Sequence, residues 1–133
     1  MFNAKVYKIA IFSLSGTMEE IYAAKEMVGS WNKTKAESAG KMYMLVDDAQ
    51  SADVLVGIIG NRLENQELVD ESLKDGRQVL LFFNEYADPK NTIASEQKAV
   101  KDYRIYSQDQ CVCSDYNGVT SFRELLNERL DIV

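Results

Sequence analysis

The sequence predicts an α/β fold, a single-domain three-layer α/β/α sandwich around a five-stranded parallel sheet. Short apolar runs alternate with polar or amphipathic stretches of helical length along the 133 residues. Two runs, Val54–Gly60 and Gln78–Asn84, are almost continuously apolar, as in central strands covered on both faces. No internal repeat or Pro/Gly-rich linker divides the chain, so we expect one domain over residues 1–133.

The first predicted pair is a strand over Val6–Ser13 and a helix over Met18–Trp31. Thr17 is placed as the N-cap, and Glu20 completes a capping box with it. One helix face collects apolar residues at helical spacing, and we expect it to be buried: Met18, Ile21, Ala24, Val28 and Trp31.

The middle of the chain is predicted to hold the centre of the sheet. In order, we expect a polar loop (Asn32–Gly40), a strand (Met42–Val46), a helical turn (Asp47–Ala52), a strand (Val54–Gly60) and a helix (Leu63–Lys74). Gly76 fits the C′ position that ends this last helix, before the strand Gln78–Asn84.

The last third is predicted to add a helix over Thr92–Val100 and an edge strand near Gln110–Cys113. A final helix begins at Ser121, with Glu124 as its capping-box partner. Its buried face is expected to consist of Phe122, Leu125, Leu126 and Leu130. Five strands in this class take the order 2-1-3-4-5, which makes the carboxyl ends of strands 1 and 3 the expected ligand edge.

Composition excludes several classes of function. With 15 Lys and Arg against 21 Asp and Glu, the net charge of −6 disfavours nucleic acids and anionic membranes as partners. No apolar run approaches the ~20 residues of a membrane span, so we expect a cytoplasmic protein. Without any His, a zinc site or a His-activated nucleophile lacks its residues. Cys111 and Cys113 are expected to be reduced thiols with ordinary pKa values.

The loop after the first strand is the first candidate site. It contains Ser13, Ser15, Gly16 and Thr17, and the next helix begins directly after it. Hydroxyls, backbone N–H groups and a helix N-terminus suit a phosphate or carboxylate. A capped strand-to-helix turn without a ligand explains the same residues, and both interpretations stay open.

The loop after the third strand is the second candidate. Gly60, Asn61 and Arg62 end the most apolar strand, and Asn84 ends the next one. The following acidic helix is expected to stack Glu64, Glu67 and Glu71 on one face. These carboxylates form either a solvated face or a functional group above the sheet edge, with Glu67 as the candidate nucleophile or ribose-binding residue.

Four segments resemble the nucleoside 2-deoxyribosyltransferase-like and TIR-like superfamily. Residues 12–20 (FSLSGTMEE) are similar to its opening strand, Ser/Thr-rich turn and acidic helix start. Residues 52–62 (ADVLVGIIGNR) match its small-Asp-apolar strand ending in Gly-x-Arg. Glu67 through Gly76 to Glu85 is similar to its Glu-bearing helix, Gly and apolar strand, and residues 116–130 look like its closing turn and helix. The nearest resemblance is to the TIR-related domain of NACHT and tetratricopeptide signalling proteins.

This resemblance implies binding of a nucleoside, nucleotide or NAD-like ligand, with cleavage or transfer at the N-glycosidic bond if the chain is an enzyme. Glu67 would then act on the ribose carbon, while Ser13, Ser15 and Asn61 would orient sugar or phosphate groups. The resemblance requires no cofactor, and it implies that a second copy of the chain can complete the site. A signalling or interaction module of the same fold, without chemistry, is the alternative.

The first loop also resembles the phosphate loop of flavodoxins, whose sheet has the same strand order. Residues 13–17 (SLSGT) followed by Glu19, Glu20 and Ile21 carry this likeness, which implies FMN as a minority alternative. Flavodoxins hold the flavin ring between aromatic side chains. The stretch Asn61–Asn65 has none, and Tyr86 is the one well-placed aromatic residue.

Overall fold

The computed structural model describes residues 4–13, 18–85 and 93–133. A five-stranded, wholly parallel sheet has the order β2-β1-β3-β4-β5, which confirms the flavodoxin-like order expected from the sequence. The elements in chain order are β1 (Lys5–Ser13), α1 (Met18–Ala39), β2 (Lys41–Leu45), a 3₁₀ turn (Ala49–Ser51), β3 (Val54–Ile59), α2 (Gln66–Lys74), β4 (Gln78–Asn84), α3 (Ala94–Ser107), β5 (Val112–Tyr116) and α4 (Gly118–Ile132).

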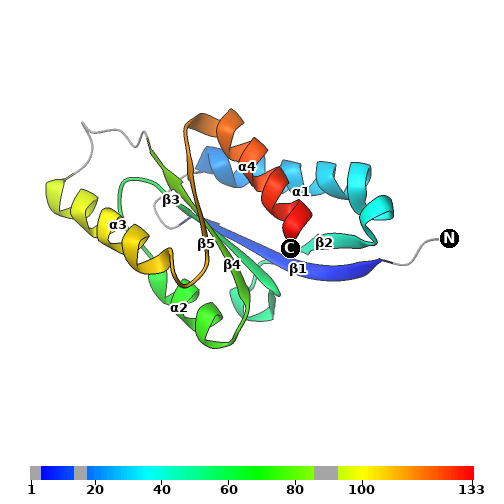
Figure 1. The fold of residues 1–133 in the computed structure, drawn as a ribbon, viewed down its shortest axis with the longest axis horizontal. Helices are drawn as coiled ribbons and strands as arrows, with labels where there is room; N and C mark the ends of the chain where they lie inside the picture. The colour runs from blue at the N-terminus through cyan, green and yellow to red at the C-terminus, as the bar shows by residue number, and fades with distance from the viewer. Residues whose placement is uncertain (1–3, 14–17, 86–92) are drawn as a thin grey trace.

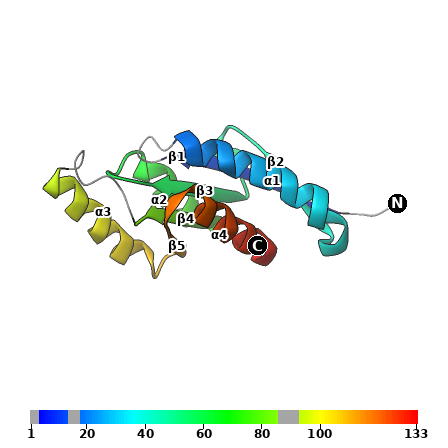
Figure 2. The same cartoon turned by 90° about the horizontal axis from the view of Figure 1, so that it is seen from above.

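Helices cover both faces of the sheet, so the three-layer arrangement is confirmed (Figure 1). The core on one face joins the sheet to α1 and α4, with Trp31, Phe82 and Phe122 at its centre. The core on the other face is built around the strands, the 3₁₀ turn and α2, with Leu55 and Val69 among its buried residues. Figure 2 shows α3 at the end of the molecule opposite β2.

Polar contacts hold α1 against α4 on the first face. The indole N–H of Trp31 donates to Asp131 at 2.8 Å, and the Lys35 ammonium pairs with the same carboxylate at 3.0 Å. Arg123 of α4 pairs with Glu26 of α1. The two helices therefore form one layer over the same half of the sheet.

Helix α1 is longer than predicted, because the expected polar loop Asn32–Gly40 is helical as far as Ala39. This stretch is rich in Lys, Ala and Glu, which are good helix formers, but only Ala36 in it is buried after Trp31. Gly40, at φ 69°, provides the left-handed residue that ends the helix. Met18 was also misassigned, since its side chain is 56% exposed.

Helix α2 begins at Gln66 rather than Leu63, because Asn65 takes the left-handed conformation at φ 56°. Glu64 therefore lies in the loop, and the predicted stack of Glu64, Glu67 and Glu71 on one helix face is wrong. At the other end, Gly76 at φ 74° follows the helix, as predicted for its C′ residue.

The C-terminal third differs most from the expectation. Helix α3 runs past Val100 to Ser107, and β5 is Val112–Tyr116 rather than Gln110–Cys113. Helix α4 begins at Gly118, so Ser121 is not its N-cap and the second capping box is wrong. The Ser121 hydroxyl instead accepts a hydrogen bond from the Asn117 backbone N–H at 3.2 Å. The predicted buried face of this helix is largely confirmed, with Phe122, Leu126 and Leu130 at 0% exposure.

Within the described parts of the chain, none of the helices has both the length and the apolar character needed to cross a bilayer.

Candidate functional site at the carboxyl edge

Three residues predicted for the site lie where β1, β3 and β4 end. Ser13 is the last residue of β1, Asn84 is the last of β4, and Gly60 directly follows β3. Ile59 of β3 pairs with Phe83 of β4, so the next residues along the two strands, Gly60 and Asn84, lie level with each other. Asn84 in turn pairs with Tyr116 at the end of β5. Ser13 pairs with Ile58 just below. Alternation along the strands directs Ser13, Gly60, Asn84 and Tyr116 to the face covered by α1 and α4.

A half-buried carboxyl group also lies at this edge, on Glu20 in the first turn of α1. Burial raises the pKa of Glu20, and the charge of Glu19 adds to the rise, while a hydrogen bond from its own backbone N–H opposes it. The pKa of Tyr116 is raised as well, mainly by burial and further by the charge of Glu20. The Tyr116 hydroxyl is buried and has no hydrogen-bond partner among the described residues. A carboxyl group with a perturbed pKa beside a buried hydroxyl is typical of a functional site.

The loop after β3 contributes a buried acceptor. The side-chain oxygen of Asn61 is buried and accepts no hydrogen bond from any described residue. Nearly all buried polar atoms in folded proteins have a partner, so this oxygen has an unused capacity to accept a donor.

Arg62 and Glu64 of the same loop form an ion pair at 2.6 Å, with 57% and 37% of their side chains exposed. The positive charge of Arg62 is therefore partly compensated inside the loop itself. An anionic ligand that uses Arg62 would compete with Glu64 for the guanidinium.

Glu67, the carboxylate predicted to act on the ribose, is exposed in the first turn of α2. This helix packs on the face opposite α1 through the buried Val69. The sheet therefore separates the body of α2 from the helix that carries Glu20. The catalytic role of Glu67 stays a prediction.

Ser15, Gly16 and Thr17 lie outside the described residues, as does Tyr86, so the first predicted loop is represented by Ser13 alone. The described loop 61–65 provides no aromatic ring to stack on a flavin. The residues on which the FMN-binding alternative depends therefore lie outside the described parts of the chain, and this alternative stays a prediction.

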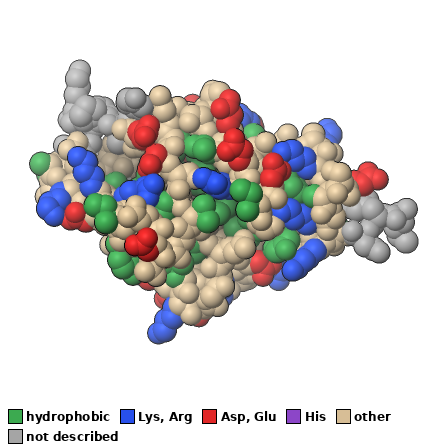
Figure 3. All heavy atoms as spheres, viewed as in Figure 1, with side chains coloured by type: hydrophobic (Ala, Val, Ile, Leu, Met, Phe, Trp, Pro, Cys, Tyr) green, Lys and Arg blue, Asp and Glu red, His purple; other side chains and the backbone are tan. Residues whose placement is uncertain are grey.

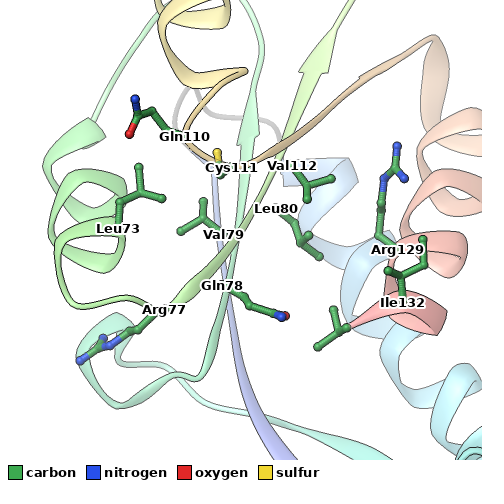
Figure 4. Close-up of a pocket in the computed structure, with 11 residues that line it drawn as sticks. Leu73, Arg77, Gln78, Val79, Leu80, Gln110, Cys111, Val112, Arg129 and Ile132 are labelled. Carbon is green, nitrogen blue, oxygen red and sulfur yellow. The ribbon is translucent and has the colours of Figure 1, made fainter.

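A separate cavity of about 290 Å³ opens at the amino ends of β4 and β5, far from this edge. Figure 4 shows Leu73 and Val79 on one side of it and Arg129 and Ile132 on the other. Its two cations are engaged, since Arg77 donates to the Ala49 carbonyl at 2.6 Å and Arg129 to the Ser114 hydroxyl at 3.0 Å. The lining is otherwise mostly apolar, so the cavity suits a polar or charged ligand less well than the carboxyl edge does.

Sequence reasoning did not identify Glu20 and Tyr116 as site residues. Glu20 was interpreted as a capping partner and as part of two family resemblances, and Tyr116 was placed in a closing turn. The signal for Glu20 was its position directly after the first candidate loop. Tyr116 could not be placed without the correct end of β5, which sets it level with Asn84.

Comparisons with known proteins agree with the fold. No protein-family model matches the sequence, and neither does any curated protein. Two solved structures of homoserine dehydrogenase from S. aureus, at pH 6.5 and pH 7.0, each superpose with a TM-score of 0.51 at 13% identity. The matches cover 85% and 88% of this chain but 33% of the dehydrogenase chain.

The likeness is one of fold alone. At this identity it carries no substrate or activity to this chain, which spans about a third of the dehydrogenase's length. It does support the assignment of the described strands and helices to a parallel α/β domain.

Proposed function

We propose that this chain binds a nucleoside, nucleotide or NAD-like ligand at the carboxyl edge of the sheet, between the ends of β1, β3 and β4. The observation that carries the proposal is the buried side-chain oxygen of Asn61, the second residue after β3, which accepts no hydrogen bond from any described residue. It lies where ligands bind in open parallel sheets. A ribose hydroxyl or a base amino group supplies the donor that this oxygen accepts, and Ser13 and Asn84 add polar groups nearby.

The electrostatics of the edge suit a ligand with both a sugar and a phosphate. The guanidinium of Arg62 can bind a phosphate in place of Glu64, its present ion-pair partner. Glu20 adds a carboxyl group whose raised pKa makes it easier to protonate than an ordinary one. The resemblance of residues 12–20 and 52–62 to the deoxyribosyltransferase-like and TIR-like proteins supports the same class of ligand.

Asn61→Leu separates binding from folding. If the Asn61 oxygen serves a ligand, removing it abolishes binding while leaving the free protein equally or more stable, because a buried acceptor without a partner costs about 1–3 kcal/mol. Isothermal titration with NAD, ATP and adenosine measures binding, and urea unfolding measures stability. Glu37→Gln, at the far end of α1, is the matched control. Undiminished affinity in Asn61→Leu would remove the proposed site.

Cleavage or transfer at an N-glycosidic bond is a second candidate, favoured by the half-buried Glu20 beside Tyr116. Two carboxylates compete for the role: Glu67 by resemblance and Glu20 by its raised pKa. Base release from NAD, ribonucleosides and deoxyribonucleosides, followed by liquid chromatography, distinguishes them. Loss of release in Glu67→Gln alone assigns the chemistry to α2, and loss in Glu20→Gln alone assigns it to α1.

Ligand binding without base release would favour the alternative function, a signalling module without catalysis. Self-association of the chain on adding NAD would then identify this module. Light scattering measures that association directly. A second copy of the chain is then the partner that the superfamily resemblance implies.

A further inference from the structure

The turn between α3 and β5 places the thiols of Cys111 and Cys113 against the same residue, Ser107. Ser107, fully buried at the end of α3, accepts hydrogen bonds at its carbonyl from the backbone N–H groups of Gln110 and Cys111. The Cys111 sulfur lies 3.6 Å from that carbonyl oxygen, and the Cys113 sulfur lies 3.5 Å from the Ser107 hydroxyl oxygen. Cys111 precedes β5 in a bend, so the pair is not confined to the spacing of an extended strand.

The surroundings differ for the two sulfurs. The Cys111 S–H donates to the Ser107 carbonyl, and the interaction with Cys111 is the main cause that lowers the pKa of Cys113 to about 6. The guanidinium of Arg104 acts in the same direction, while burial and Asp115 oppose it. The pKa of Cys111 is raised, because its proton is held by Cys113 and the site is partly buried. The two cysteines are not joined by a disulfide, as expected, but the expectation of ordinary pKa values for them is wrong.

The charged groups around the pair come from α3 and β5. Arg104 forms a two-pronged ion pair with Asp115, at 3.1 and 3.2 Å, and its guanidinium lies 5.4 Å from the centre of the Phe83 ring. Tyr103 is the other titratable group nearby, and burial raises the pKa of its hydroxyl further above the ordinary value. On β4, the register places the apolar Leu81 beside Cys113. Arg104 is thus the one cation that acts on both thiols among the described residues.

Both thiols are half-buried rather than sealed. Cys111 also forms part of the wall of the cavity at the amino ends of β4 and β5, so a small molecule in this cavity can reach the Cys111 side of the pair (Figure 4). In Figure 3, hydrophobic and basic side chains lie next to one another in the middle of the face that carries β5.

We propose that Cys111 and Cys113 form a peroxide-reactive thiol pair, in which Cys113 is the nucleophile and Cys111 resolves it to a reversible disulfide. The Cys113 thiolate attacks one oxygen of a hydroperoxide, the O–O bond breaks, and hydroxide leaves to give a sulfenic acid. The Cys111 sulfur then attacks the Cys113 sulfur, the S–O bond breaks, and the departing hydroxide takes the Cys111 proton as water. Two thiols and one hydrogen peroxide give one disulfide and two waters.

The test is oxidation of the full chain with a small excess of hydrogen peroxide at pH 7, followed by peptide mass spectrometry. The wild type is expected to lose two hydrogen atoms within the peptide that holds both residues. Cys111→Ser is expected to accumulate a sulfenic acid on Cys113 that dimedone traps, while Cys113→Ser leaves Cys111 unmodified at the same dose.

Two variants, one that removes a positive charge and one that removes a negative charge, test whether the charged residues beside the thiols control the reactivity of Cys113. Arg104→Gln is expected to slow the labelling of Cys113 by about threefold or more, and Asp115→Asn is expected to accelerate it. Lys98→Gln, on the exposed side of α3, is the matched control and should change nothing. Faster labelling of Cys111 than of Cys113, equal rates in all three charge variants, or wild-type oxidation that ends in sulfinic acid would each overturn the proposal.

Discussion

The side-chain amide of Asn32 makes both of its hydrogen bonds to the backbone of Tyr43. Its oxygen accepts from the Tyr43 N–H at 2.8 Å, and its nitrogen donates to the Tyr43 carbonyl at 2.7 Å. Tyr43 belongs to β2, an edge strand of the sheet. Asn32 thus takes the place of a further strand at this point, which protects the edge and fixes α1 to it.

Asn32→Ala should therefore lower the free energy of unfolding by about 1–3 kcal/mol, because two backbone groups lose their partner at once. Urea denaturation measures the change. Lys33→Ala, an exposed neighbour on the same helix, is expected to stay within about 0.5 kcal/mol of the wild type. An Asn32 variant as stable as the Lys33 variant would show that the edge needs no such cap.

Two glycines should respond to alanine with opposite signs. Gly29 lies inside α1 with open space where a Cβ would project, so Gly29→Ala should stabilise the protein by about 0.5–1 kcal/mol. Gly76 has a φ of 74°, so Gly76→Ala should destabilise it by about 1–2 kcal/mol. Thermal unfolding of both variants, followed by circular dichroism, gives the signs. A stabilising Gly76→Ala would contradict the assigned end of α2, and a destabilising Gly29→Ala would contradict the open space assigned to that position in α1.

The Asp131 carboxylate should make stability depend on acid pH. The Lys35 ammonium, followed by the Trp31 indole, lowers the pKa of Asp131 in the folded state. Its contribution is therefore complete above the unfolded value of about 4 and is lost as the pH falls through the lower folded value.

Asp131→Asn keeps an acceptor for Trp31 but removes the charge. The stability difference from the wild type should be below about 1 kcal/mol at pH 7, since the pair is exposed, and should shrink from pH 5 towards pH 2. Urea titrations at each pH measure it, with Asp109→Asn on the exposed turn after α3 as the control. A difference that grows with acidity would have the wrong sign for this account.

Glu64→Gln should strengthen binding of phosphate-bearing ligands, since it releases Arg62 from its ion pair. An exposed pair of this kind is worth less than about 1 kcal/mol, so the gain should not exceed about fivefold. Separate titrations with ATP and with adenosine measure the gain in affinity for each ligand. Only ATP should gain, because adenosine has no phosphate for Arg62 to bind. An equal gain for both ligands would place Arg62 away from the phosphate.

The sheet could be predicted from the sequence because its signal is local. The continuously apolar runs at β3 and β4 fix their positions to within one residue, and the strand order was inferred from the fold class that the alternation indicates. The later part of α1 could not be predicted, because the contacts that hold it come from β2 and α4, through Asn32 and Lys35. No periodic pattern of apolar residues in 32–39 predicts those contacts.

The candidate site could be predicted only where it follows directly from a strand end. Ser13, Gly60 and Asn84 were found in this way. Glu20 was not, because its significance depends on its burial and on the position of Tyr116, which are tertiary facts. The exposed acidic residues of α2 were predicted as candidate site residues because a cluster of acidic residues can be recognised in a sequence, whereas the burial of a single residue cannot.

The most direct test of the central claim is a titration of isotope-labelled protein with NAD, followed by backbone amide chemical shifts. A ligand at the carboxyl edge should move the signals of Gly60, Asn61 and Asn84 in a saturable manner, and those of Arg77 and Ile132 at the opposite cavity should stay in place. Shifts confined to the cavity residues, or none at millimolar NAD, would contradict the proposed site.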